Sequence, residues 1–200
     1  MPAMPYQPQP YNEKLDSLTG GISAETNRAH YGLYENYVKK FNECQEALVS
    51  ADRSAANQIY SAYRGLMVDM TFAIGGIKNH EIYFSHLGGN GQPVDGGFKS
   101  QVEADFGSWE AYLTDLKAAA MAGRGWAWTA WDDDFGRLLN VIGDAQNTFP
   151  VWNAHPVVAI DVYEHAYVGD FSTARPKYLE ALFANMDWKV VEDSFTKLHG

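Results

Sequence analysis

The sequence predicts an α+β fold: an N-terminal helical hairpin followed by a mixed α/β domain with a small three-stranded antiparallel sheet. Two helical stripes of apolar residues fill the first half of the chain. A stretch at 88–98 holds five glycines and a proline. After residue 124, aromatic and small residues alternate as they do in strands. A helical half followed by a half that contains strands is typical of α+β proteins.

The first helix is expected to begin after Ser23, because serine is a good N-cap and Glu25 then suits the helix dipole. Four prolines among the first ten residues predict an extended arm before it. Positions three and four apart share one face of a helix. The stripe that marks this face is Thr26, His30, Leu33, Tyr37, Phe41, Cys44 and Leu48.

A second helix is expected from about Ser54 to Leu87. Gly75 and Gly76 interrupt its interior, and each costs about 1 kcal/mol relative to alanine. They therefore indicate close packing, or a neighbour that needs the space. The stripe of this helix is Met70, Ala73, Ile77, His80, Phe84 and Leu87.

The glycine-rich stretch predicts a linker over 89–98, between an arm and hairpin at 1–88 and a C-terminal α/β domain at 99–200. The second domain is expected to open with a helix from about Ser100 to Ala122. The elements expected after it are strands at 125–131, 137–142 and 157–161, a turn at 132–136, and helices at 164–167 and from 175 onward.

Composition narrows the possible functions. With 46% hydrophobic and 14% aromatic residues, the 200-residue chain can bury a sizeable core. Its formal charge of −10 argues against nucleic acid and anionic membranes as partners. A single cysteine, Cys44, excludes an internal disulfide and a multi-cysteine zinc site and fits a reducing compartment. With no apolar run of membrane-spanning length and no signal-peptide pattern, a cytoplasmic protein is expected.

Four residues could form a metal site. His30 and His80 lie in the middle of the two helical stripes, Asp161 ends an apolar run, and His165 follows four residues later. One histidine in such a stripe is usually a hydrogen-bonded core residue. Three imidazoles and one carboxylate that converge are a ligand set for a transition metal. The remaining histidines stand at a helix end, in a loop and next to last in the chain, and are interpreted as structural: His86, His155 and His199.

The segment Asp161–Tyr167 reads Asp-Val-Tyr-Glu-His-Ala-Tyr and resembles the signature of the iron/manganese superoxide dismutase family, where the third residue is usually tryptophan. The resemblance covers nearly the whole chain in the family's order. Its other segments are 22–32 around His30, Asn79-His80 with Tyr83, Gly125–Trp128, and 174–180.

The resemblance implies that His30, His80, Asp161 and His165 hold one manganese or iron ion per chain. In the family this ion cycles between its +2 and +3 states and converts two superoxide anions to dioxygen and hydrogen peroxide. Zinc cannot replace it, because zinc has no redox chemistry. The residues that the resemblance places around the ligands are Trp126, Gly76, Phe84 and Tyr163, the last two where the family usually has tryptophan.

A glutamine beside the metal comes from one of two places in the family. The first, four residues before the second histidine ligand, is Gly76 in this chain. The second, in the loop on the strand side, is matched by Gln146. By resemblance this arrangement favours manganese over iron, and Gly76 is interpreted as leaving room for Gln146.

The substrate entrance departs from the family. Its tyrosine is best matched by Tyr37, seven residues after His30 and one fewer than usual. At roughly 100° per residue, the missing residue predicts a displaced phenol unless one of the two helices is distorted. The family's entrance histidine falls at Leu33 or Tyr34, and its tyrosine partner across the dimer falls at Val168.

The resemblance also implies a homodimer or a higher oligomer, in which Glu164 would contact the partner subunit's His165. The other interpretation of Glu164 is a solvated residue at a helix start. Two alternatives to superoxide disproportionation stay open: a metal-binding protein of the same fold with little activity and another role, and a different metal-centred oxidase or hydrolase. Gln146, Trp126 and Glu164 favour the dismutase, because a scaffold needs none of them.

Overall fold

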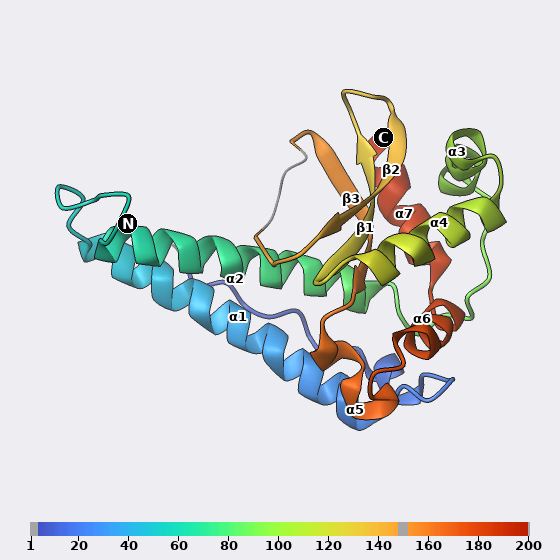
Figure 1. Ribbon diagram of the computed structural model, residues 1–200, viewed down its shortest axis with the longest axis horizontal. Helices are drawn as coiled ribbons and strands as arrows, with labels where there is room; N and C mark the ends of the chain where they lie inside the picture. Colours follow the sequence, from blue (N-terminus) through green and yellow to red (C-terminus); the bar gives the residue numbers. More distant parts are fainter. Residues whose placement is uncertain (1–3, 148–151, 200) are drawn as a thin grey trace.

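The computed structural model describes residues 4–147 and 152–199, and it confirms the predicted fold class. Helices α1 (Ala24–Ser50) and α2 (Ala62–Ser85) pack as a hairpin whose far end projects from the body of the molecule (Figure 1). The body holds the sheet together with helices α3 (Gly97–Phe106), α4 (Trp109–Ala122), α6 (Arg175–Ala184) and α7 (Trp188–His199).

The sheet is three-stranded and antiparallel, in the order β2-β1-β3. Strand β1 (Trp126–Asp132) lies between β2 (Arg137–Gly143) and β3 (Ala154–Asp161). Its first residue, Trp126, pairs with Asp161 at the end of β3. Because α2 packs against β3, this register brings the end of β3 to the inner half of the hairpin.

Three predicted boundaries were wrong. Helix α2 begins at Ala62 rather than Ser54, because Asn57 accepts the backbone N–H groups of Ile59 and Tyr60 and holds the chain in a loop. The expected helix at 100–122 is divided at Gly107, whose φ of +88° ends α3 before Ser108 caps α4. Strand β3 begins at Ala154, so His155 lies in a strand and not in a loop.

The arm at residues 4–12 contains no helix or strand and lies along the hairpin. Tyr6 exchanges two hydrogen bonds with the side chain of Asn42, through its backbone N–H and C=O. A short 3₁₀ helix, η1 (Glu13–Ser17), leads on toward α1. Tethering by side chains therefore replaces regular structure in the arm.

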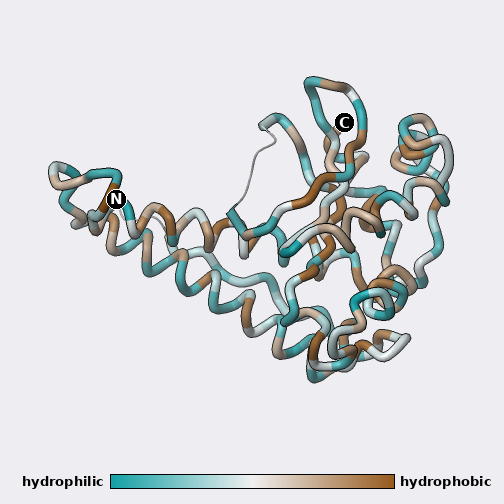
Figure 2. The backbone as a smooth tube through the Cα atoms, viewed as in Figure 1, coloured by the Kyte–Doolittle hydropathy of each residue, from teal (hydrophilic) through white to brown (hydrophobic). Residues whose placement is uncertain are grey.

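Burial in α1 follows a stripe beside the predicted one. Its buried residues include His30, Tyr34 and Val38, whereas Leu33 is 36% exposed. Hydrophilic and hydrophobic stretches alternate along both long helices in Figure 2, as expected for helices with one covered face. Over the described residues, no helix is both long enough and apolar enough to cross a membrane.

Candidate metal centre

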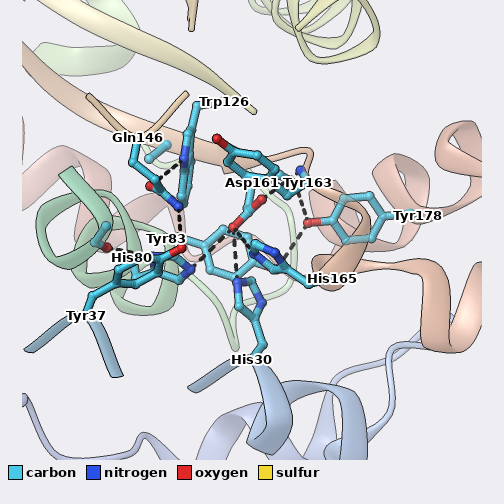
Figure 3. A network of polar contacts seen from close by, with 12 residues as sticks. His30, Tyr37, His80, Tyr83, Trp126, Gln146, Asp161, Tyr163, His165 and Tyr178 are labelled. Carbon is cyan, nitrogen blue, oxygen red and sulfur yellow. Dashed lines mark hydrogen bonds and ion pairs between the residues drawn. The ribbon is translucent and has the colours of Figure 1, made fainter. Parts of the chain in front are cut away.

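Four elements bring the four predicted ligand residues together. His30 comes from α1, His80 from α2, Asp161 from the end of β3, and His165 from the 3₁₀ helix η2 (Glu164–Ala166) (Figure 3). One nitrogen or oxygen atom from each lies within 4.8 Å of the others. The first three residues are buried and His165 is partly exposed, so the group sits just beneath the surface.

Backbone and side-chain hydrogen bonds fix the carboxylate of Asp161. Its Oδ1 accepts the backbone N–H of Tyr163 at 2.9 Å. Its backbone C=O accepts the hydroxyl of Tyr178 at 2.9 Å, and that hydroxyl lies 3.2 Å from the hydroxyl of Tyr83. Oδ2 is therefore turned toward the three imidazoles.

The spacing of these atoms suits a common metal ion. Asp161 Oδ2 lies 3.1 Å from His30 Nε2, 3.2 Å from His165 Nε2 and 3.5 Å from His80 Nε2. Ligand bonds of about 2.0–2.2 Å at near-tetrahedral or right angles place neighbouring donor atoms about 3.0–3.5 Å apart. The spacing around this carboxylate oxygen therefore suits a first-row transition metal.

The protonation of His80 supports the same conclusion. Its Nδ1 lies 2.6 Å from the carbonyl oxygen of Gly76, which can only accept, so Nδ1 carries the proton. Its Nε2 then presents a lone pair toward the Asp161 carboxylate, is buried, and has no hydrogen-bond partner among residues 4–147 and 152–199. A lone pair that faces a carboxylate oxygen in a buried site is unfavourable unless a cation or a proton lies between them.

Burial keeps the imidazoles of His30 and His80 in the neutral form that binds metals. It lowers the pKa of His80 to about 3, assisted by the neighbouring His30. Burial also lowers the pKa of His30 and outweighs the contacts to Asp161 that raise it. For Asp161, burial raises the pKa, but the contacts of His165 and His30 outweigh it and leave the pKa below its ordinary value. The carboxylate is thus ionised beside the neutral imidazoles of His30 and His80.

A chain of hydrogen bonds lies against the ligands. The indole N–H of Trp126 donates to Oε1 of Gln146 at 3.0 Å, and Nε2 of Gln146 donates to the hydroxyl of Tyr37 at 3.2 Å. The ring of Trp126 meets His80 edge-on at 5.2 Å, and the ring of Tyr37 lies 5.5 Å from His80. Burial raises the pKa of Tyr37, and the bond from Gln146 opposes that rise. The structure therefore links all three residues to the same ligand.

The other residues expected around the ligands also contact them. Tyr163 stacks on His165 with ring centres 5.3 Å apart, and Phe84 meets His30 edge-on at 5.1 Å. Gly76 contacts the site through the carbonyl that accepts from His80.

The interpretation of Gly76 was wrong. A Cβ at position 76 would lie 2.5 Å from the ring of Tyr37, so its missing side chain makes room for Tyr37. A Cβ at Gly75 would lie 1.8 Å from the carbonyl oxygen of Gln146. The neighbouring glycine therefore accommodates Gln146.

A groove lies over Tyr37. This groove, of about 390 Å³, is lined by Leu33, Tyr37 and Phe72 among others. Tyr34 is buried instead, and its hydroxyl donates to Glu81 at 2.8 Å. Of the two positions that could replace the family's entrance histidine, Leu33 is thus the one at the groove.

The positions expected at a subunit contact are exposed. Val168 is 45% exposed at the start of α5 (Val168–Phe171). Glu164 is exposed too, and within the described part of the chain its carboxylate has no hydrogen bond or ion pair. Both side chains are therefore accessible to a second subunit. The exposure of Glu164 is also consistent with the other interpretation, a solvated residue at a helix start.

Sequence reasoning missed three contributors to the site. Tyr178 holds the backbone of Asp161, and its segment had been matched to the family without a role. Gly75 had been noticed only as half of a glycine pair. Glu81 joins Tyr6 and Tyr34 beside His80, and no periodicity could reveal it because its partners are distant in sequence.

Comparison with known proteins identifies the family. Residues 2–88 match the model described as the alpha-hairpin domain of iron/manganese superoxide dismutases, and residues 94–194 match the C-terminal domain of the same family. The chain is 45% identical over 183 residues to an iron superoxide dismutase of Aquifex pyrophilus, covering 88% of this chain and 85% of the relative.

Two further relatives cover most of the chain. An iron superoxide dismutase of Aquifex aeolicus is 44% identical over 195 residues, 94% of this chain and 91% of the relative. The second manganese superoxide dismutase of Haloferax volcanii is 30% identical over 187 residues, 92% of each chain. The chain therefore belongs to the iron/manganese superoxide dismutase family, and it is a superoxide dismutase with one iron or manganese site.

Proposed function

We propose that His30, His80, Asp161 and His165 are the ligands of the redox metal at which this chain disproportionates superoxide. The observation that carries the proposal is the lone pair of His80 Nε2, which faces the Asp161 carboxylate without a hydrogen bond. Bound iron or manganese would supply a one-electron redox couple, by which one superoxide anion is oxidised to dioxygen and a second, with two protons, is reduced to hydrogen peroxide.

The protein's own residues orient the ligands and supply polar groups beside them. Gly76 fixes the tautomer of His80, and Tyr178 fixes the backbone of Asp161. The buried rings of Trp126 and Phe84 exclude water from the sides of the imidazoles. We assign to Tyr37 the role of gate and proton donor at the groove, with its hydroxyl held by Gln146.

For the choice of metal, the position of Gln146 supports manganese. The glutamine comes from the strand-side loop, and Gly76 stands at the alternative position on α2. A specific observation favours iron as the second candidate: the two Aquifex relatives, at 45% and 44% identity, are named as iron enzymes. We keep manganese as the prediction and test it against iron in the same protein.

We further propose that the chain acts as a dimer or higher oligomer, with Glu164 at the contact. The exposed carboxylate of Glu164 lies next to His165, whose side chain is 27% exposed. A cytoplasmic location remains a prediction, supported by the single cysteine, which fits a reducing compartment.

One experiment tests the activity and the metal together. The purified protein is analysed for metal, and superoxide decay is measured on the same sample. Apoprotein is then loaded with manganese or with iron and compared at equal occupancy. We expect one metal per chain and faster turnover with manganese. Much faster turnover with iron would overturn the metal preference, and a fully loaded protein without activity would overturn the function.

A further inference from the structure

The side chain of Gln146 is held at both ends of its amide. Trp126 donates to its oxygen, and its nitrogen donates to Tyr37, at 3.0 and 3.2 Å (Figure 3). These bonds orient the amide but do not determine how closely the loop that carries it approaches α2. That approach depends on what the backbone of Gln146 contacts.

The backbone of Gln146 contacts Gly75. A Cβ built on Gly75 would lie 1.8 Å from the carbonyl oxygen of Gln146 and 2.6 Å from its carbonyl carbon. Both distances are far inside van der Waals contact, and both partners are backbone atoms, which cannot rotate away as a flexible side chain can. Any other residue at position 75 therefore forces the loop away from α2.

The two adjacent glycines have different tasks. Gly76 makes room for the ring of Tyr37, and Gly75 makes room for the carbonyl of Gln146. They thus position the two partners of one hydrogen bond. Glycine has a lower helix propensity than alanine, so two glycines in the interior of α2 are unfavourable unless the space is used.

We propose that Gly75 is a positioning residue that determines the distance of Gln146 from the metal and thereby the metal's reduction potential. The inference rests on the proposed role of Gln146 beside the metal. Polar groups around the ligands tune the potential of a metal, and a displaced amide loses its contacts to Trp126 and Tyr37 together. Gly75 would accordingly help to decide which of the two metals works well in this chain.

The test compares Gly75→Ala with Gly65→Ala in the manganese-loaded enzyme. Gly65 lies in the same helix, and a Cβ there meets nothing within 4 Å, so it controls for helix propensity. We expect Gly75→Ala to change the reduced-to-oxidised ratio at a fixed potential at least tenfold, a shift of about 59 mV for one electron. Amide hydrogen exchange around residues 144–147 should rise at least fivefold, and Gly65→Ala should change neither quantity.

Gln146→Ala and the double variant with Gly75→Ala distinguish a wrong role for Gly75 from a wrong role for Gln146. If Gly75 acts through Gln146, both single variants shift the potential in the same direction and the double variant adds nothing to Gln146→Ala. Additive shifts, or an unchanged potential in Gly75→Ala, would overturn the inference and leave the role of Gln146 intact. An unchanged potential in Gln146→Ala would overturn that role, and the inference with it.

Gly75→Ala alone could fail to fold. In that case Gly75→Ala with Gln146→Gly is examined, because a glycine at 146 lets the loop turn its carbonyl away. We expect this pair to fold and to show the potential of Gln146→Ala. If it also fails to fold, a Cβ at position 75 meets something other than the carbonyl of Gln146, and the proposal is wrong.

Discussion

At the scale of single residues, the ability of the site to bind a metal depends on the protonation of its ligand side chains. The carbonyl of Gly76 accepts the Nδ1–H of His80, which leaves its Nε2 with a lone pair and no hydrogen-bond partner among the described residues. The carboxylate of Asp161 stays ionised because two imidazole contacts outweigh the effect of burial on its pKa. The site therefore offers electron-pair donor atoms to a cation, and its polar atoms do not all satisfy one another by hydrogen bonds.

His80→Ala should reduce bound metal to below about a tenth of the wild-type content and lower the thermal stability. The variant removes one of four donors and leaves the charge of Asp161 less compensated in a buried site. Metal analysis and thermal unfolding of the same samples check this. His155→Ala is the matched control, because that histidine is 45% exposed and pairs with Asp133 at the surface. Full metal occupancy in His80→Ala would refute the ligand assignment.

Tyr37→Phe should slow turnover several-fold at unchanged metal content. The change removes only the hydroxyl that Gln146 binds and keeps the ring that packs over Gly76. A purely structural tyrosine would alter stability and leave turnover alone. Steady-state superoxide decay and metal analysis distinguish the two roles. Tyr31→Phe makes the same change on the same helix, at a hydroxyl that donates only to the backbone of Gln9, and should leave turnover at the wild-type level.

The ligands could be predicted from the sequence, whereas their support could not. His30 and His80 stand out as histidines inside apolar stripes, and Asp161 and His165 as a short motif. Glycine carries no such signal, because its role depends on what occupies the space of the missing side chain. Only the structure shows that Gly75 faces Gln146 and Gly76 faces Tyr37.

At the scale of elements, α1 resolves the unusual spacing of His30 and Tyr37. The helix is continuous from Ala24 to Ser50, and seven residues at about 100° each come within about 20° of two full turns. Both side chains therefore face the site without distortion. The sequence alone could not settle this point, because it does not show whether the first helix of this chain, or of the family, is regular.

The end of α2 carries a histidine that metal binding does not use. His86 is buried, and its Nε2 donates to the carbonyl of Ala159 in β3 at 3.0 Å, whereas its Nδ1 has no hydrogen-bond partner in the part of the chain that the structure describes. Burial lowers its pKa to about 4. This imidazole thus joins the hairpin to the sheet in its neutral form.

The pH dependence of folding should report on His86. The unfolded chain binds a proton near pH 6.5, before the folded chain does, so stability present above that pH is lost as the pH falls toward 4. The expected loss is on the order of 2–4 kcal/mol. Denaturant unfolding at pH 7 and pH 4.5 measures it. His86→Gln keeps a donor for Ala159 and should lose less stability between these two pH values; an equal loss in both proteins would rule out His86 as the source.

At the scale of the whole molecule, the acidic surface and the metal site have opposite effects on an anionic substrate. The chain carries a formal charge of −10. Neutral imidazoles and one carboxylate leave a trivalent ion with net positive charge, so the attraction for superoxide is confined to the metal centre.

The sequence predicted most helices and strands of the molecule, because their hydrophobic patterns are local. It could not predict the surface around Leu33 and Val168, whose exposure depends on tertiary packing.

Glu164→Ala should weaken both assembly and metal retention. In the proposed dimer this carboxylate contacts the partner subunit's His165, so its loss frees an imidazole that holds the metal. Light scattering and the rate of metal loss to a chelator measure the two effects. The acidic control is Glu180→Ala, an exposed residue of α6 away from the site. A wild-type protein that is monomeric and fully loaded would defeat the proposal.

In the proposed dimer, Leu33 and Val168 stand at the positions of the family's entrance pair. Leu33 lines the groove over Tyr37, and Val168 follows the segment that carries His165. If the two positions meet across subunits, they replace a polar histidine–tyrosine pair of the family with an apolar contact. Such a contact holds the subunits but supplies no titratable imidazole near Tyr37.

Leu33→His combined with Val168→Tyr should then restore a hydrogen bond between subunits and raise turnover or dimer stability, whereas either change alone should lower dimer stability by leaving a polar group without its partner. Dimer dissociation on dilution and superoxide decay measure both outcomes. Tyr34→His is the contrasting variant, because Tyr34 is buried and bonded to Glu81. This variant should destabilise the hairpin and raise neither turnover nor dimer stability. If the Leu33 and Val168 pair gains neither activity nor dimer stability, these residues do not meet across an interface.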